Sequence, residues 1–224
     1  SKGTLKIGTS KYTLDNFKPL GAAGSSVIVC KGGKFDVNGK YGFKGNYDVI
    51  LDGGTVVNQA QRNDHSAFNP RLTMTADSTF SNSGSEKKYG FAAEGSLGGR
   101  VLTVEVKSLL YWQPKIADGT VMLTGTKELS VTADTDMRTV NFDESGATLN
   151  LNGCTLSVSN YIANLAGSRT KTEGSLNVYG VFTPNTDNFF PPTMQGGSII
   201  DLSAKEGPWA AGDTAFAAGG ATIA

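Results

Sequence analysis

The chain has few of the residues from which catalytic and metal sites are most often built. Its 224 residues include two cysteines, Cys30 and Cys154, and one histidine, His65. The cysteines lie several repeats apart, which is too far for a disulfide, and we expect both to be small buried hydrophobes. One histidine completes neither a zinc site with such distant cysteines nor a nucleophilic triad without further partners. We therefore assign no catalytic residue and expect no cofactor.

An excess of one charge and long apolar runs are also missing. Lysine and arginine total 20, aspartate and glutamate total 20, and the formal net charge is zero. A neutral chain lacks the basic surface that nucleic acid requires, so we expect no nucleic-acid partner. No stretch approaches the roughly 20 apolar residues of a membrane helix, so we expect no membrane span in this segment.

Glycine is abundant, with 29 residues, and it marks an internal repeat. An apolar residue, a small-residue corner and an apolar strand recur as VCKGGKFDV at 29–37 and ILDGGTVV at 50–57. The pattern returns as NLNGCTLSV at 150–158 and TMQGGSII at 193–200. Repeats of this length, each with a strand beside a tight corner, are typical of stacked solenoids.

Two apolar columns run through the aligned repeats. One column contains Cys30, Leu51, Leu151 and Met194, and the other contains Phe35, Val56, Leu156 and Ile199. The columns are five positions apart, and a straight strand would place them on opposite faces. A glycine corner turns the chain, so that both columns point into one core.

The repeat therefore predicts an all-β fold, a single-stranded parallel β-helix that is right-handed by the usual rule for parallel crossovers. We expect irregular coils of about 20–28 residues, with 1–224 as one domain. Residues 101–106 are the strongest predicted strand. Segments 3–7 and 217–224 look like strands already under way. We therefore expect a fragment of a longer protein whose remainder caps the solenoid ends.

The glycine-cornered strands resemble those of right-handed parallel β-helix proteins with the pectin-lyase-like architecture. GGTV at 53–56 and GCTL at 153–156 are also similar to strands of bacterial surface β-helices, such as autotransporter passengers. This resemblance implies an extracellular or bacterial cell-surface location. It favours a non-catalytic structural or adhesive segment whose loops contact glycans or proteins of a host or neighbouring cell.

Aromatic residues cluster in three expected loops and are the candidates for a ligand-binding surface. Flat aromatic faces stack well on sugar rings at a low cost in side-chain entropy. The alternative is that they pack locally against the solenoid wall. The candidates are Tyr111, Trp112, Phe189, Phe190 and Trp209.

Two other functions remain open. A polysaccharide lyase or glycoside hydrolase would need Asp134, Asp136 and Asp143 to converge with an arginine. Asp134 and Asp136 are weak candidates for a calcium pair, since carboxylate oxygens suit hard cations. An aspartate-rich turn explains them more simply, so we assign no metal site. The second alternative is a phage tail-fibre segment, which would form trimers.

Overall fold

The computed structural model describes residues 3–7, 24–37, 43–58, 68–82, 89–116, 118–142, 147–162, 169–171, 174–183, 193–194, 199–200, 217–218 and 222–223. All regular elements in these ranges are β-strands. No helix that could cross a membrane occurs in them. The predicted all-β class is confirmed.

The described strands form two sheets in which neighbouring strands run parallel. We call the fourteen-stranded sheet the long sheet and the nine-stranded sheet the short sheet. The strands of the long sheet are β1 (Thr4–Ile7), β3 (Lys34–Val37), β5 (Thr55–Asn58), β7 (Ser78–Asn82), β10 (Val101–Val106), β12 (Thr120–Gly125), β14 (Thr135–Phe142), β16 (Thr155–Ile162), β18 (Ser175–Val178), β19 (Val181–Thr183), β20 (Thr193–Met194), β21 (Ile199–Ile200), β22 (Ala217–Ala218) and β23 (Thr222–Ile223). The strands of the short sheet are β2 (Ser26–Cys30), β4 (Phe43–Asp52), β6 (Phe68–Ala76), β8 (Tyr89–Phe91), β9 (Glu94–Ser96), β11 (Leu110–Trp112), β13 (Glu128–Val131), β15 (Thr148–Asn150) and β17 (Arg169–Lys171).

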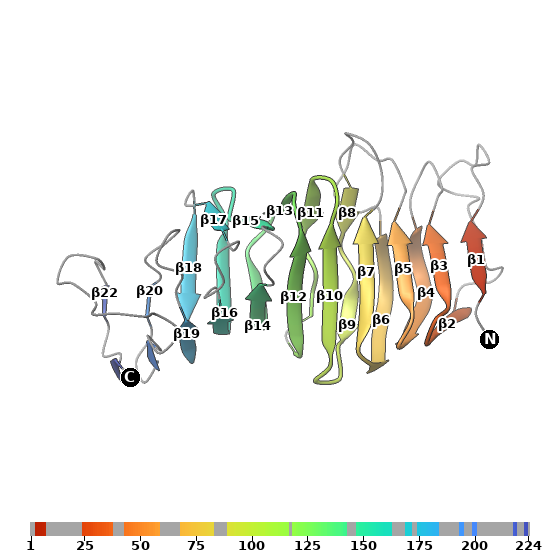
Figure 1. The fold of residues 1–224 in the computed structure, drawn as a ribbon, viewed down its shortest axis with the longest axis horizontal. Coiled ribbons are helices and arrows are strands. Elements are labelled where there is room, and N and C mark those ends of the chain that lie inside the picture. The colour runs from red at the N-terminus through yellow and green to blue at the C-terminus, as the bar shows by residue number, and fades with distance from the viewer. Residues whose placement is uncertain are drawn as a thin grey trace.

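From β1 to β18 the chain passes back and forth between the two sheets, with β8 and β9 both in the short sheet, and it winds as a right-handed parallel β-helix (Figure 1). The long sheet lies nearer the viewer in Figure 1, with its N-terminal strands on the right. Lys34 pairs with Thr55, 21 residues later, whereas Val101 pairs with Thr120, only 19 residues later. Coil length is therefore irregular, as predicted.

Alternation of side chains within each strand builds the core. In β10, the strongest predicted strand, Leu102, Val104 and Val106 are fully buried, whereas Val101 and Thr103 are half-buried on the outer face. Each inward residue stacks on the inward residue of the next turn because neighbouring strands are in register. One such column contains Phe35, Val56, Phe80, Val104, Leu123 and Phe142.

The first predicted column is wrong at its first and last members. Met194 lies on β20 of the long sheet and pairs with Val178, whereas Leu51 lies on β4 of the short sheet. Val29, rather than Cys30, pairs with Leu51, while Cys30 pairs with Asp52. Val29 is buried and Cys30 is exposed, because Cys30 is the last residue of β2 and points outward. Cys154 is half-buried. The prediction of two buried cysteines is corrected accordingly, and both are free thiols.

Glycine forms the predicted corners between the sheets. Gly32 and Gly53 adopt φ angles of 78° and 80°, a region that glycine enters without steric cost. The Gly33 N–H donates to the carbonyl oxygen of Cys30 at 2.7 Å, which closes the first corner as a tight turn. A Cβ on Gly54 would lie 2.5 Å from the Val29 carbonyl oxygen. The Gly-Gly pairs are therefore required by backbone turning and by close approach.

Aromatic rings fill the middle of the core. Phe68 lies 5.3 Å from Phe80 between ring centroids, and Phe80 lies 4.8 Å from Phe91. Phe91 stacks on Trp112 at 4.4 Å with an interplanar angle of 12°. Such contacts add to the stabilisation from burying the rings. They also fix the packing of turns that are distant in sequence.

Candidate functional site

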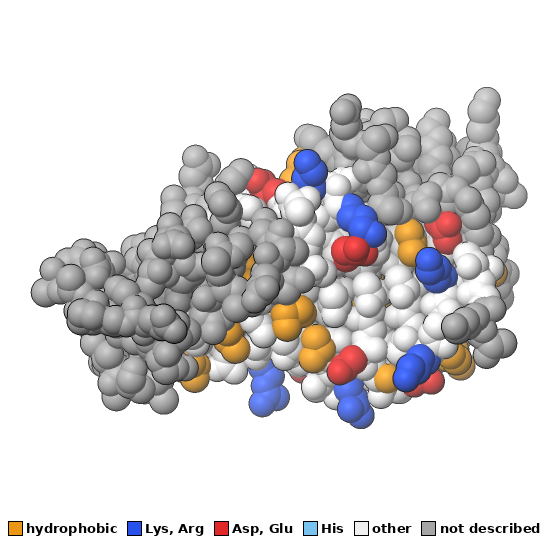
Figure 2. Space-filling view, viewed as in Figure 1, with side chains coloured by type: hydrophobic (Ala, Val, Ile, Leu, Met, Phe, Trp, Pro, Cys, Tyr) orange, Lys and Arg blue, Asp and Glu red, His pale blue; other side chains and the backbone are white. Residues whose placement is uncertain are grey.

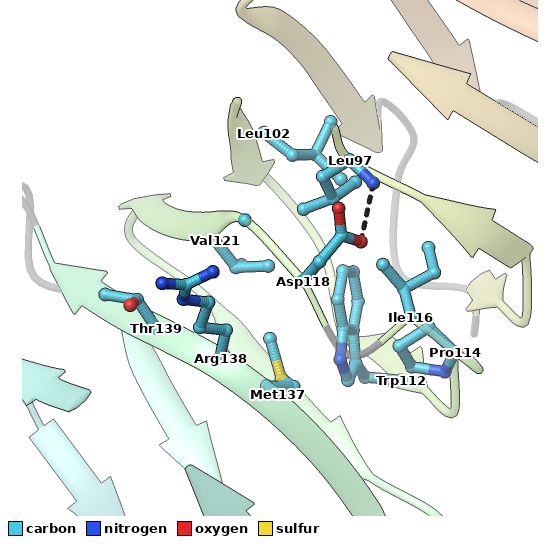
Figure 3. A pocket seen from close by; sticks show the side chains of 11 residues that line it. Leu97, Leu102, Trp112, Pro114, Ile116, Asp118, Val121, Met137, Arg138 and Thr139 are labelled. Atoms are coloured by element: carbon cyan, nitrogen blue, oxygen red, sulfur yellow. Dashed lines mark hydrogen bonds between the residues drawn. The ribbon is translucent and has the colours of Figure 1, made fainter. Parts of the chain in front are cut away.

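The most elaborate side-chain arrangement among the described residues lies at the corner between β11 and β12. It surrounds a small cavity of about 10 Å³, about the space of one water-sized sphere. Figure 3 shows side chains of β11, β12, β14 and the intervening corner converging there. The lining residues are Leu97, Leu102, Trp112, Pro114, Ile116, Asp118, Gly119, Val121, Met137, Arg138 and Thr139.

Trp112 forms one wall of this cavity. Its side chain is 1% exposed, and in Figure 3 the indole lies between Met137 and Ile116. The indole Nε1 is buried and has no hydrogen-bond partner in the described part of the chain. A buried N–H without a partner carries a desolvation penalty, so this position favours a water molecule or another small acceptor.

Asp118 is held by three donors at the same corner. Its carboxylate accepts hydrogen bonds from the Leu97 N–H at 2.8 Å, the Ser96 hydroxyl at 2.9 Å and the Gly99 N–H at 3.3 Å. Burial alone would raise the pKa of this carboxyl, but the donated hydrogen bonds outweigh it. The pKa of Asp118 therefore lies below its ordinary value. Asp118 is therefore an ionised hydrogen-bond acceptor that holds the corner together, and it has no proton to give as a general acid.

Arg138 is exposed on β14 at the rim of the cavity, and it forms no ion pair with any residue that the structure describes. The rim thus combines one saturated carboxylate, one guanidinium and one buried N–H. No histidine or cysteine lies among the lining residues. General acid–base chemistry needs a proton acceptor or donor with an available lone pair or proton near the operating pH. This cavity can hold a small polar molecule, but its residues do not make an acid–base pair.

The structure places the aromatic candidates differently. Trp112 belongs to the core, where its ring is stacked on Phe91. Tyr111 points to the outer face of the short sheet and is half-buried, with Gly90 and Ser130 beside it in register. Small neighbours leave the tyrosine as the largest side chain of its row. Phe189, Phe190 and Trp209 lie outside the described residues, and their ligand-binding role stays a prediction.

Asp134 and Asp136 lie together at the start of β14, and both are exposed. Oδ1 of Asp134 accepts a hydrogen bond at 2.7 Å from the N–H of Thr155, the first residue of β16 in the next turn. This bond uses Asp134 as a connection between turns. Within the described residues no group of three histidine, cysteine, aspartate or glutamate side chains could hold a metal ion. Asp143 lies outside those residues, so its convergence with the pair stays a prediction.

The connection made by Asp134 recurs three turns earlier in the stack. Oδ1 of Asp77 accepts a hydrogen bond from the Val101 N–H at 2.8 Å, again at the start of the next long-sheet strand. The following residue also behaves alike, since Ser78 and Thr135 each donate a hydroxyl to the carbonyl two positions back. The signal in the sequence is the repeated Thr-Ala-Asp-Ser/Thr at 75–78 and 132–135, which our motif search missed.

Two buried asparagines were also missed by the sequence analysis. Asn58 and Asn82 are in register on β5 and β7 and have no exposed surface. Asn82 donates to the Ser108 carbonyl at 2.6 Å and accepts from the Lys107 N–H at 2.8 Å. Asn58 donates to the Gly90 carbonyl at 3.3 Å. These amides satisfy backbone groups where the chain leaves the long sheet, which is a structural role.

Two ion pairs on the described surface join side chains of adjacent turns. Arg71 contacts Asp48 at 2.6 Å on the neighbouring strand. Lys115 contacts Glu94 at 2.8 Å. On the face seen in Figure 2, basic and acidic side chains are interspersed rather than grouped by sign. The described residues of this face therefore form no strongly charged surface.

The chain was compared with family models, curated proteins and solved structures, and none of them matches it. The parallel β-helix rests on the structure itself. The resemblance to pectin-lyase-like and autotransporter β-helices stays a prediction from the sequence.

Proposed function

We propose that this chain is a non-catalytic structural and adhesive β-helix segment of a bacterial cell-surface or secreted protein. It presents loops and outward side chains to glycans or to proteins of a neighbouring cell. The observation that carries the proposal is that three carboxylates at the corners of the solenoid, one of them the candidate Asp134, bind backbone groups. Asp134, Asp77 and Asp118 each bind backbone N–H groups of a neighbouring turn.

A packed core further supports a scaffold role. Large inward side chains, including Trp112, Tyr161 and Phe80, are almost completely buried. Burial raises the pKa of the Tyr161 hydroxyl far above its ordinary value, although that hydroxyl also shares a hydrogen bond with Thr170. The tyrosine therefore remains neutral at all physiological pH values. A rigid stack of this kind spaces and presents surface residues without needing a reactive group.

Tyr111 is the described residue best placed to contact a sugar ring. It is outward-facing and rigidly mounted on β11, whose inward residues Leu110 and Trp112 are buried. A glycan stacked on this ring would gain aromatic contact area at little entropic cost.

The experiment is retention of the purified chain on beads that carry a panel of bacterial and host polysaccharides. We expect retention on at least one glycan, and we expect Tyr111→Ala to weaken it about tenfold, which corresponds to about 1.4 kcal/mol. The matched control is Tyr179→Ala, because Tyr179 is a 54% exposed tyrosine at the end of β18. Equal retention of both variants would remove Tyr111 from the binding surface. No retention on any glycan would remove the glycan arm of the proposal.

A further inference from the structure

The outer face of the short sheet around Tyr111 carries amide and hydroxyl side chains. Tyr111 lies in register with Ser130 on β13, and Ser130 pairs in turn with Asn150 on β15. One residue beyond the ends of β11 and β13, the Thr132 hydroxyl donates a hydrogen bond to Gln113 Oε1 at 3.1 Å. The tyrosine ring therefore has groups beside it that can donate and accept hydrogen bonds without carrying a charge.

The charged groups close to this face are carboxylates. Glu128 lies two residues before Ser130 on β13 and faces outward with it, because side chains alternate along a strand. Its Oε1 accepts a hydrogen bond from Asn150 Nδ2 at 2.8 Å, which holds the carboxylate beside the row of Tyr111. At the other end of β13, Asp134 is exposed at the following corner. We define the Tyr111 surface as Tyr111, Gln113, Glu128, Thr132 and Asn150.

The basic side chains that the structure describes near this surface lie away from the ring. Lys107 and Lys115 each come four residues from Tyr111, on opposite sides, and each is paired with a glutamate, at 2.9 and 2.8 Å respectively. Lys127 lies at the corner before β13, about 10 Å along the strand from Ser130. Among the described residues, no cation therefore stands beside the ring to neutralise a carboxylate or sulfate of a ligand.

We infer that the Tyr111 surface binds neutral pyranose glycans rather than glycans that carry uronate or sulfate groups. Sugar hydroxyls both donate and accept hydrogen bonds, so they match the amides of Gln113 and Asn150 and the acceptor-only carboxylate of Glu128. The C–H face of an uncharged sugar ring stacks on the tyrosine. This inference rests on the proposed glycan binding at Tyr111, and it adds the class of sugar.

The carboxylate of Glu128 opposes an anionic glycan on the same surface. Such a ligand would bring its own negative charge beside Glu128, and like charges placed together in an interface weaken binding. Salt screens this repulsion, which acts over about 10 Å at 0.1 M ionic strength. The preference for neutral glycans should therefore be largest at low ionic strength and should decrease as salt is added.

The test compares the same polysaccharides with and without their charge. Beads carry polygalacturonate, alginate and hyaluronate, each also as its carboxyl-reduced, neutral product, beside a set of neutral and sulfated glycans. Affinities of the purified 224-residue chain are measured at low salt. We expect retention on neutral glycans, and we expect binding at least about tenfold tighter to the reduced form of any pair that retains the chain.

Glu128→Gln tests whether this carboxylate sets the preference. Removing its charge should strengthen binding to the uronate form and bring the two affinities of a pair close together. Glu105→Gln is the matched control, because it removes an equal charge from the outer face of the long sheet and should leave the preference unchanged. Circular dichroism should show the same strand content in all three proteins. Equal effects of the two variants would overturn the assignment to the Tyr111 surface.

Failure of this inference is distinguishable from failure of the proposed function. Retention on uronate or sulfated glycans that equals or exceeds retention on neutral ones overturns the inference, while glycan binding itself stands. Retention on no glycan removes the glycan arm of the proposed function, and the inference is overturned with it.

Discussion

At the corners of the solenoid, single carboxylates join one turn to the next. Asp77 and Asp134 accept the first N–H of the following long-sheet strand, and Asp118 gathers donors from the preceding corner. Hydrogen bonds to an ionised acceptor are stronger than neutral ones, and an unpaired strand N–H would otherwise depend on solvent. These residues therefore fix the spacing of turns where backbone pairing is interrupted.

Asp134→Ala should lower the free energy of unfolding by about 1 kcal/mol, because the Thr155 N–H loses its charged acceptor. Asp136→Ala is the control, since Asp136 is also exposed but accepts no such hydrogen bond among those the structure shows. Its substitution should change the free energy of unfolding by no more than about 0.5 kcal/mol. Urea denaturation measures both. Equal losses, or a calcium-dependent stabilisation that both variants abolish, would instead favour a cation pair.

Asp118 should make the fold sensitive to acid. Its pKa is lowered in the folded chain, so its contribution to stability is complete above the ordinary aspartate pKa and is lost as pH falls through the lower folded value. We expect Asp118→Asn to cost about 1 kcal/mol at neutral pH and progressively less below about pH 4. Urea midpoints measured from neutral to acidic pH check this. A constant difference at all pH values would show that the carboxylate charge does not matter.

Individual residues were the hardest level to predict from the sequence. The corner glycines were identified because only glycine enters the positive φ of Gly32 and Gly53 easily. Cys30 was misplaced because its neighbour Val29 is also apolar, and only strand pairing shows which of the two faces inward. The inward direction of the Trp112 side chain depends on its packing against Phe91. Phe91 lies in another turn, so the local sequence around Trp112 does not indicate this contact.

Strands and corners form a regular unit that repeats despite unequal coil length. The predicted strand at 101–106 coincides with β10, because three inward aliphatic residues alternate with outward ones. The register between strands of successive turns was harder to predict from the sequence. β14 and β16 are longer than their neighbours, so Leu156 pairs with Thr135 rather than joining the column that contains Val56. The register between strands depends on the length of each corner, and an alignment of the repeats does not take these lengths into account.

Gly54→Ala should lower the free energy of unfolding by about 1–3 kcal/mol, because its Cβ would approach the Val29 carbonyl oxygen and Cγ1 to 2.5 Å. The corner would have to shift to relieve this contact. Gly3→Ala is the matched control, since a Cβ there meets no atom within 4 Å. Thermal and urea unfolding of both variants measure the difference. If the two glycines tolerate alanine equally, close approach is not what the Gly-Gly corner requires.

As a whole, the molecule is a stack in which each turn contacts mainly its neighbours. Stability of such a stack is approximately a sum of turn and interface contributions, and the end turns have the least support. The overall architecture could be predicted because glycine corners and alternation recur along the chain.

We propose that this solenoid presents a binding surface and catalyses no reaction. The most direct measurement is product release from a panel of polysaccharides incubated with the purified chain, followed as new reducing ends and as unsaturated uronate absorbance. We predict no release above the protein-free background, including with any glycan that retains the chain on beads. Steady release that grows in proportion to protein concentration would contradict the claim and would favour a lyase or hydrolase.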